Sequence, residues 1–240
     1  MGELIGNTDP ICPYCSKALD KMPGRKKKCP HCGKYMCVRT RPVDRRRVLV
    51  TEQGVKDVDD QWTTIHAKQR VRQFVDEEEF EKEKAALAAR FGWGPSDNDV
   101  LWAIHNKDLV EHARMNNWGL YRNTRLGMAE LLVTEEKRRQ ALDTYLEVAY
   151  LDANGPNNLG GASDPDFLRQ FPPFSADSAF MAPGIVAEIE VLAEKLGLTD
   201  TDLRAAFLVA AERVRRSLKL PVAPDEGWHW LLAERTGANQ

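Results

Sequence analysis

The chain has 240 residues, of which 42% are hydrophobic and 29% are charged, and its 34 basic and 36 acidic residues give a net charge of −2. This composition excludes an intrinsically disordered chain and a membrane-embedded one. No run of about 18 apolar residues is present that could form a transmembrane helix. The first residues lack a basic segment followed by an apolar one, so we expect no secretory signal and no membrane partner.

Charge is distributed unevenly along the sequence. Residues 1–50 contain 12 basic and 4 acidic residues, a net charge of +8, whereas residues 51–240 carry −10. All five cysteines also lie in the first segment. We therefore expect a basic domain over residues 1–50 and an acidic remainder of different character.

Two Cys-Pro-x-Cys pairs mark a metal site. Cys12 and Cys15 form the first pair, Cys29 and Cys32 form the second, and 13 residues lie between the pairs. Each short pair can form a tight turn that supplies two tetrahedral thiolate ligands, as in zinc ribbons and rubredoxins. We expect one structural Zn²⁺ that replaces a hydrophobic core, because four thiolates leave no open position for catalysis. Iron accepts the same ligands and stays open as an alternative.

Other roles for these cysteines are disfavoured. Disulfides do not persist in the reducing compartment that we expect, and a thioredoxin-like redox pair requires a Cys-x-x-Cys motif that opens a helix after a strand. His31, inside the second pair, is expected to point outward. Cys37 lies in a strand-forming run at residues 34–40, where we expect a small buried side chain, and residues 48–50 predict a second strand.

Basic residues form two clusters in the same domain. The first occupies the segment between the cysteine pairs, and the second precedes the strand at 48–50. Their members are Lys21, Arg25, Lys26, Lys27 and Lys28, and Arg45, Arg46 and Arg47. This patch is suited to contact nucleic-acid phosphates, an acidic protein surface or the acidic remainder of this chain, and a merely solvated face is the remaining alternative.

Residues 51–95 predict a charged helical connector. Thr51 is a suitable N-cap, and apolar residues follow at steps of three and four. Residues 76–84 are almost all charged, and the apolar pattern is broken there. If residues 52–91 form one helix, it spans about 60 Å and suits a contact with an oligomer or a partner. The alternative is two helices with a break.

Residues 96–240 predict an all-α helical domain. We therefore expect the whole chain to be mainly α, with a small N-terminal β zinc ribbon and a helical bundle that a long helix connects to it. We expect helices over 96–115, 117–153, 183–196 and 199–218, and a short final helix that carries Trp228 and Trp230. Between them lies an irregular, aromatic-rich loop at 157–182. Its four phenylalanines predict a packed clasp, since these side chains are not expected in water: Phe167, Phe171, Phe174 and Phe180.

No catalytic motif is found. The chain has no Gly-x-Ser-x-Gly, His-Glu-x-x-His or phosphate-binding loop. His105 and His112 lie seven residues apart without a third ligand nearby, which argues against a second metal site. We therefore expect neither an enzyme nor a small-molecule substrate.

Two longer stretches carry a resemblance to a known group. The first runs from Cys12 to Trp62 and contains Lys-Cys-Pro-His-Cys-Gly-Lys at 28–34, Val-Arg-Thr-Arg-Pro at 38–42 and Asp-Arg-Arg-Arg-Val-Leu-Val-Thr-Glu at 44–52. The second is Tyr-Leu-Glu-Val-Ala-Tyr-Leu-Asp-Ala-Asn-Gly-Pro-Asn-Asn at 145–158. Together they resemble zinc-ribbon proteins of tailed bacteriophages and prophages. The resemblance covers about a third of the chain.

The resemblance implies zinc ligands at Cys12, Cys15, Cys29 and Cys32 and a phage-encoded protein made in the cytoplasm of a bacterial host. The leading hypothesis is a non-enzymatic structural or adaptor protein of a phage particle or its assembly machinery, which contacts other proteins or further copies of itself. The alternative is a DNA-binding accessory protein, in packaging or regulation, that uses the basic ribbon.

Overall fold

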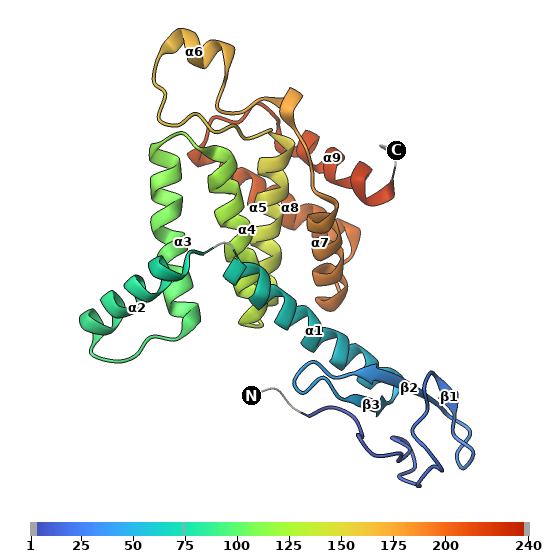
Figure 1. Ribbon diagram of the computed structural model, residues 1–240. Helices are drawn as coiled ribbons and strands as arrows, with labels where there is room; N and C mark the ends of the chain where they lie inside the picture. Colours follow the sequence, from blue (N-terminus) through green and yellow to red (C-terminus); the bar gives the residue numbers. More distant parts are fainter. Residues whose placement is uncertain (1–3, 74, 238–240) are drawn as a thin grey trace. The chain divides into compact units, whose positions relative to one another are not determined.

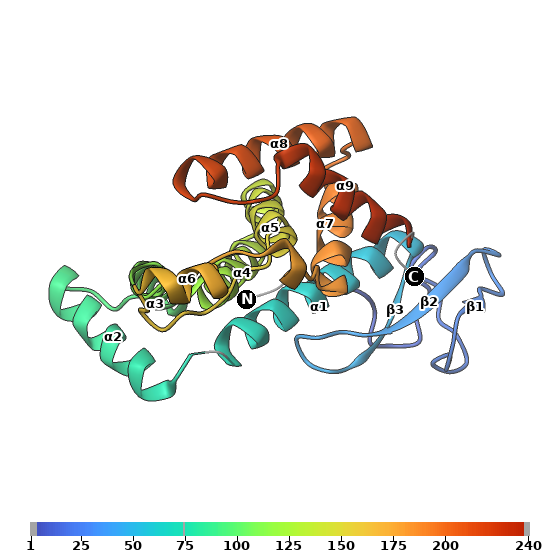
Figure 2. The same cartoon turned by 90° about the horizontal axis from the view of Figure 1, so that it is seen from above.

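The computed structural model describes residues 4–73 and 75–237 (Figure 1, Figure 2). In this part of the chain a three-stranded antiparallel sheet near the N-terminus is followed by nine α-helices. The predicted fold class, mainly α with a small N-terminal β ribbon, is confirmed. The chain separates into two compact units, Met1–Gln69 and Arg70–Gln240, and the division falls in the last part of the first helix. None of the described helices is both long and apolar enough to cross a membrane.

The first unit is built on a small sheet. Its strands, in the spatial order β1-β2-β3, are β1 at Lys27–Lys28, β2 at Tyr35–Thr40 and β3 at Arg47–Val50. The central strand β2 is antiparallel to both neighbours, and its first residue, Tyr35, lies opposite Lys28. One small core links the sheet to α1 (Glu52–Gln73); its buried members are Cys37, Val48, Val50 and Val58. The strands predicted at 34–40 and 48–50 are confirmed.

The charged connector is broken into two helices. α1 ends at Gln73, and α2 spans Glu77–Phe91. The side chain of Asp76 caps α2 by accepting a hydrogen bond from the backbone N–H of Glu79 at 3.1 Å. Acidic residues in the first turn of α2 also favour a helix start there, because they complement the positive end of the helix dipole. A single continuous helix over 52–91 is therefore wrong, and the two-helix alternative is confirmed.

The second unit is a helical bundle centred on α5. Its long helices after α2 are α3 at Asp97–Arg114, α4 at Trp118–Thr134, α5 at Arg138–Ala153, α7 at Pro183–Lys195, α8 at Asp200–Ser217 and α9 at Pro224–Thr236. α5 contacts α4, α7, α8 and α9, and 12 of its 16 residues are buried (Figure 2). A second apolar cluster joins α2, α3 and α4. The two capping boxes, at Ser96 and Thr199, begin α3 and α8 as the sequence predicts.

The predicted helix over 117–153 is in fact the pair α4 and α5, joined by a tight turn. Glu136 has a left-handed backbone conformation, with φ of 59°. The N–H of Lys137 then donates to the carbonyl of Leu132 at 3.0 Å, which satisfies a carbonyl at the end of α4. Glycine usually occupies such a position, and its absence here explains why the sequence pattern continues across the turn.

The loop at 157–182 is ordered by its backbone rather than by buried aromatic side chains. It contains α6 (Pro165–Gln170) and a 3-10 turn at Ala176–Ser178. Phe174 packs against the ring of Trp118, with 5.3 Å between the ring centroids. The other three phenylalanines are 40%, 48% and 70% exposed, in the order Phe167, Phe171 and Phe180. The predicted clasp of four buried phenylalanines is therefore wrong for three of them.

Hydrogen bonds hold this loop together with the buried side chains of Leu159 and Met181. Asn157 donates from its backbone N–H to the carbonyl of Pro173 at 2.9 Å and from its side chain to the carbonyl of Pro172 at 2.8 Å. Gly155 begins the turn with φ of 56°, and a Cβ atom there would lie 1.9 Å from the carbonyl oxygen of Ser175. The close approach of two backbone segments therefore requires glycine at this position.

Replacing Gly155 with alanine is expected to destabilise the second unit by more than about 2 kcal/mol, because left-handed strain adds to a clash with backbone. Gly160→Ala is the matched control: Gly160 has φ of 58° but no atom within 4 Å of the added Cβ, so we expect a loss of only about 1 kcal/mol. Urea unfolding of both variants measures the difference. Equal losses would contradict the close approach at Gly155.

Candidate metal centre

The two cysteine pairs form two equivalent turns. In the first turn, the N–H of Ser16 donates to the carbonyl of Cys12 at 2.9 Å, and the N–H of Cys12 donates to the carbonyl of Lys17 at 3.0 Å. The second turn repeats both hydrogen bonds; its members are Cys29, Gly33 and Lys34. The residue after each second cysteine is left-handed, with φ of 57° at Ser16 and 73° at Gly33.

Backbone N–H groups point at the first sulfur of each pair. The N–H of Tyr14 lies 3.4 Å from the Sγ of Cys12, and the N–H of His31 lies 3.4 Å from the Sγ of Cys29. Such contacts stabilise a thiolate by placing positive dipoles beside its charge. The turns predicted from the Cys-Pro-x-Cys pattern are therefore formed, and they present the sulfur atoms in the way that a metal ligand requires.

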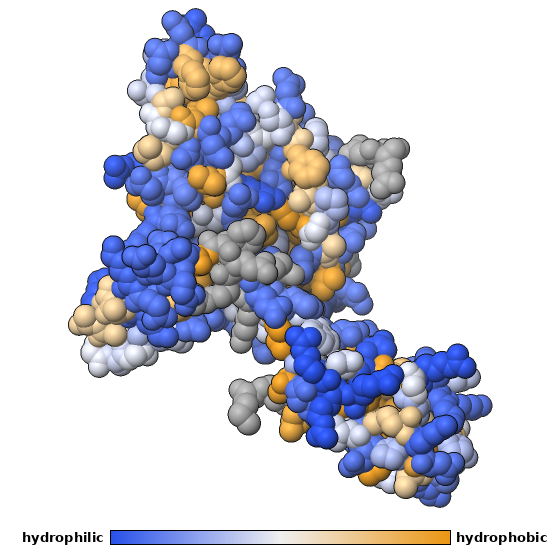
Figure 3. Space-filling model, viewed as in Figure 1, coloured by the Kyte–Doolittle hydropathy of each residue, from blue (hydrophilic) through white to orange (hydrophobic). Residues whose placement is uncertain are grey.

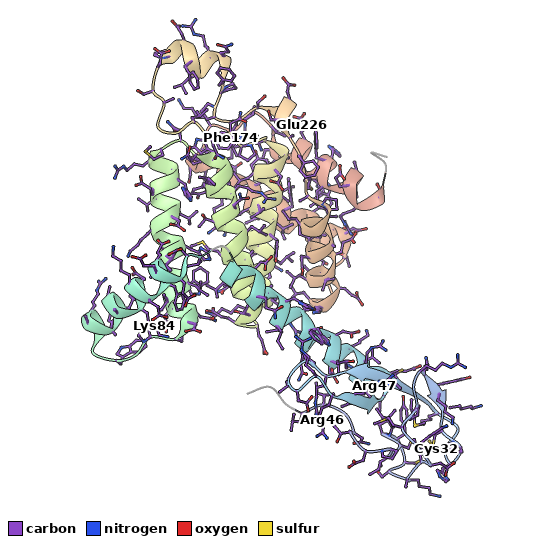
Figure 4. All side chains as sticks on the ribbon, viewed as in Figure 1. Cys32, Arg46, Arg47, Lys84, Phe174 and Glu226 are labelled. Carbon is purple, nitrogen blue, oxygen red and sulfur yellow. The ribbon has the colours of Figure 1, made fainter. Side chains whose placement is uncertain are left out.

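The four sulfurs form one cluster. All four lie within 4.8 Å of one another, and across the two turns Cys12 is 3.8 Å from Cys32 and Cys15 is 3.9 Å from Cys29 (Figure 4). Sulfurs bound tetrahedrally to zinc at about 2.3 Å lie about 3.8 Å apart, whereas a disulfide requires about 2.05 Å. The arrangement therefore fits a metal ion and does not fit disulfides, and the four cysteines are free.

The ionisation of the thiols differs within the cluster. Burial raises the pKa of Cys29, but the backbone hydrogen bonds from Cys32 and His31 lower it more, to about 6. The backbone hydrogen bond from Lys17 lowers the pKa of Cys15, but desolvation and the neighbouring thiols raise it to about 11. Ionisation of Cys15 is thus disfavoured unless a cation lies among the sulfurs.

The remaining metal-type side chains are outside the cluster. Cys37 is 6% exposed and belongs to the core beneath α1, so its predicted role as a buried side chain is confirmed. His31 is exposed, and its ring nitrogen lies 3.2 Å from the carbonyl of Ala18. Within residues 4–73 and 75–237 no other group of three or more His, Cys, Asp or Glu side chains could hold a metal, and His105 and His112 form none.

All eight predicted basic contact residues are exposed. We call this set the basic surface: Lys21, Arg25, Lys26, Lys27, Lys28, Arg45, Arg46 and Arg47. Its two clusters meet where the guanidinium of Arg47 donates to the carbonyl of Gly24 at 2.9 Å. Lys26 forms an ion pair with Glu52 at 3.0 Å, and the guanidinium of Arg45 stacks 4.5 Å from the ring centre of Trp62. The basic surface therefore joins two segments that lie on opposite sides of β2 in the sequence.

A buried arginine, which sequence reasoning missed, positions the second basic cluster. Arg41 has a side chain only 5% exposed and forms a two-pronged ion pair with Asp44, with Nε 3.1 Å from Oδ1. Its remaining nitrogen donates to the carbonyl of Ile5 at 3.1 Å. Asp44 in turn accepts from the N–H of Arg46 at 3.1 Å. The run Arg-Pro-Val-Asp at 41–44, which places the two charges three residues apart, is the signal that could have indicated this turn.

Comparison with protein families, with curated proteins and with solved structures finds no match to this chain. The chemical role of the cluster and of the basic surface is therefore argued from the residues and their geometry.

Cys29→Ser is expected to abolish metal binding and to unfold the ribbon, because three thiolates cannot complete the tetrahedral site. Metal analysis and the dispersion of amide NMR signals from residues 4–50 are the measurements. Cys37→Ala is the matched control; it should keep one metal ion per chain and lose about 1 kcal/mol of stability for the small cavity. A folded ribbon in the Cys29→Ser variant would contradict a stabilising role for the cluster.

Asp44→Asn is expected to destabilise the ribbon at neutral pH but not in strong acid. The guanidinium of Arg41 lowers the pKa of Asp44 from 3.8 to about 2. Because the pKa of Asp44 is lower in the folded protein than in the unfolded chain, the ion pair stabilises the fold at pH values above the unfolded pKa. This stabilisation disappears as the pH falls through the folded pKa. The stability difference between the parent and the variant should therefore shrink between about pH 4 and pH 2. Asp20→Asn, at an exposed position, is the control, and a difference independent of pH would contradict the ion pair.

Proposed function

We propose that the four-cysteine cluster binds one structural zinc ion. The distances between sulfurs support a tetrahedral site, and four thiolates leave no position for a substrate or for water. A segment of about 40 residues with so small an apolar core depends on such a metal for its stability. Iron has the same donor preference and is the competing metal.

We further propose that the chain is a non-enzymatic structural or adaptor protein that acts through contacts with other proteins. The observation that carries this proposal is that each of the two compact units exposes a set of residues suited to contact a partner. The first unit presents the basic surface, and the second presents an aromatic loop, which we define as residues 157–182. An adaptor requires two such surfaces on one chain.

The aromatic loop is suited to protein contact. The rings of Phe167 and Phe171 lie 5.0 Å apart at their centroids and are both exposed. They line a groove of about 340 Å³ together with residues at the base of the loop, including Asn158 and Ser175. Figure 3 shows apolar side chains at this end of the second unit, where Figure 1 labels α6. Exposed aromatic residues in a pocket are typical of the anchor positions of protein interfaces.

The resemblance to phage zinc-ribbon proteins suggests the setting, a phage particle or its assembly machinery in a bacterial host. Within this proposal the ribbon is a rigid module, and both surfaces contact other proteins of the assembly or further copies of the chain. The chain would then be present in purified particles or in an assembly intermediate.

Phe171→Ser is expected to reduce incorporation of the chain into phage particles without affecting its fold. Since Phe171 is exposed, the change in stability should stay within about 0.5 kcal/mol. Quantitative mass spectrometry of purified particles is the measurement. Trp93→Ser, at a residue that is 55% exposed and far along the chain from the loop, is the matched control. Absence of the parent chain from particles and intermediates would contradict the structural role, and equal incorporation of both variants would contradict the role of the loop.

A DNA-binding accessory protein is the second candidate, and one observation favours it. Ion pairs within the described residues leave most of the basic surface unneutralised, since Lys26 alone of its eight members forms one. The link between Arg47 and Gly24 further joins the two clusters into one positively charged region. Such a region attracts phosphates strongly at low salt.

A further inference from the structure

An exposed tyrosine lies within the basic surface. Tyr35 is 53% exposed at the start of β2, and its hydroxyl makes no hydrogen bond to a described residue. The other tyrosine of the first unit, Tyr14, is half-buried, and its hydroxyl accepts a hydrogen bond from the N–H of Glu52 at 3.1 Å. Tyr14 therefore has a structural role in the ribbon, whereas Tyr35 presents an aromatic ring to solvent.

Two lysines lie near the ring of Tyr35. Lys28 lies opposite Tyr35 in the β1–β2 ladder, and residues opposite each other in a ladder point to the same face of a sheet. The ammonium group of Lys26 lies 5.4 Å from the centre of the Tyr35 ring. Lys26 is also paired with Glu52 at 3.0 Å, whereas Lys28 forms no ion pair with a described residue. The face therefore combines one exposed ring with the unpaired cation of Lys28, and Arg25 and Lys27 extend the positive charge along the chain.

We propose that this face binds single-stranded nucleic acid, with an unpaired base stacked on Tyr35 and a phosphate beside Lys28. An aromatic ring on a basic sheet surface offers a stacking platform, and only a single strand has base faces free to use it. A duplex uses the cations alone. An acidic protein segment also satisfies the cations, but it carries no planar group that requires the ring. The proposal rests on the nucleic-acid candidate above and names its ligand.

The test uses the full chain with its metal bound. Fluorescence anisotropy is measured with a labelled oligothymidine of about 15 nucleotides and with a duplex of equal length, over a range of salt concentrations. Tyr35→Ala is expected to weaken binding of the single strand about tenfold and to leave duplex binding unchanged. Tyr35→Phe keeps the ring and should bind like the parent. Lys28→Ala should weaken binding of both ligands. For the single strand, it should reduce the slope of log affinity against log salt concentration by about 0.7.

Controls separate stacking from folding and from charge. Metal content and NMR dispersion establish that each variant keeps its ribbon, and Trp93→Ala removes an exposed ring in the other unit. If Tyr35→Ala binds the single strand as tightly as the parent while Lys28→Ala does not, the stacking proposal fails and the nucleic-acid candidate stands. If the parent binds neither the single strand nor the duplex at low salt, the stacking proposal and the nucleic-acid candidate both fail. A third outcome is that the parent and Tyr35→Ala bind polyglutamate equally and both prefer it to oligothymidine. That result would assign the face to an acidic protein and overturn the proposal.

Discussion

The first unit depends on one constraint, the convergence of four cysteine sulfur atoms at one point. β1 has only two residues and β3 has four, so the sheet alone supplies few hydrogen bonds and little apolar area. The sulfurs tie the turn that precedes β1 to the turn that connects β1 with β2. Without a cation between them, thiolates less than 4 Å apart repel, and the turns lose the group that holds them together.

The same turn determines where the exposed residues of the ribbon lie. The N–H of Cys29 donates to the carbonyl of Lys34 at 2.8 Å, which closes the second turn. The residues on either side of this turn, Lys28 and Tyr35, therefore become partners in the ladder. The turn that carries Cys29 and Cys32 thus sets the register of β1 on β2, and this register places Lys28 opposite the exposed ring.

Sequence patterns predicted the features that depend on a local chemical rule. The cysteine spacing indicated the cluster, and the cap residues Ser96 and Thr199 indicated where α3 and α8 begin. The turn between α4 and α5 was not predictable, because Glu136 adopts a left-handed conformation that usually requires glycine. The exposure of Phe171 was missed for a different reason: its loop is held by Asn157 and Gly155, so its aromatic side chains are not needed for packing. Residue type alone does not show which groups hold a loop.

Residues 145–155, at the end of α5 and directly after it, are buried in the helical bundle. Asp152 is buried and accepts two hydrogen bonds from Arg122 at 2.6 Å, and the side chain of Asn154 joins the carbonyl of Tyr150 to the N–H of Val222. Burial raises the pKa of Asp152, and the hydrogen bonds and charge of Arg122 oppose that shift. The polar side chains in this stretch therefore serve the bundle core.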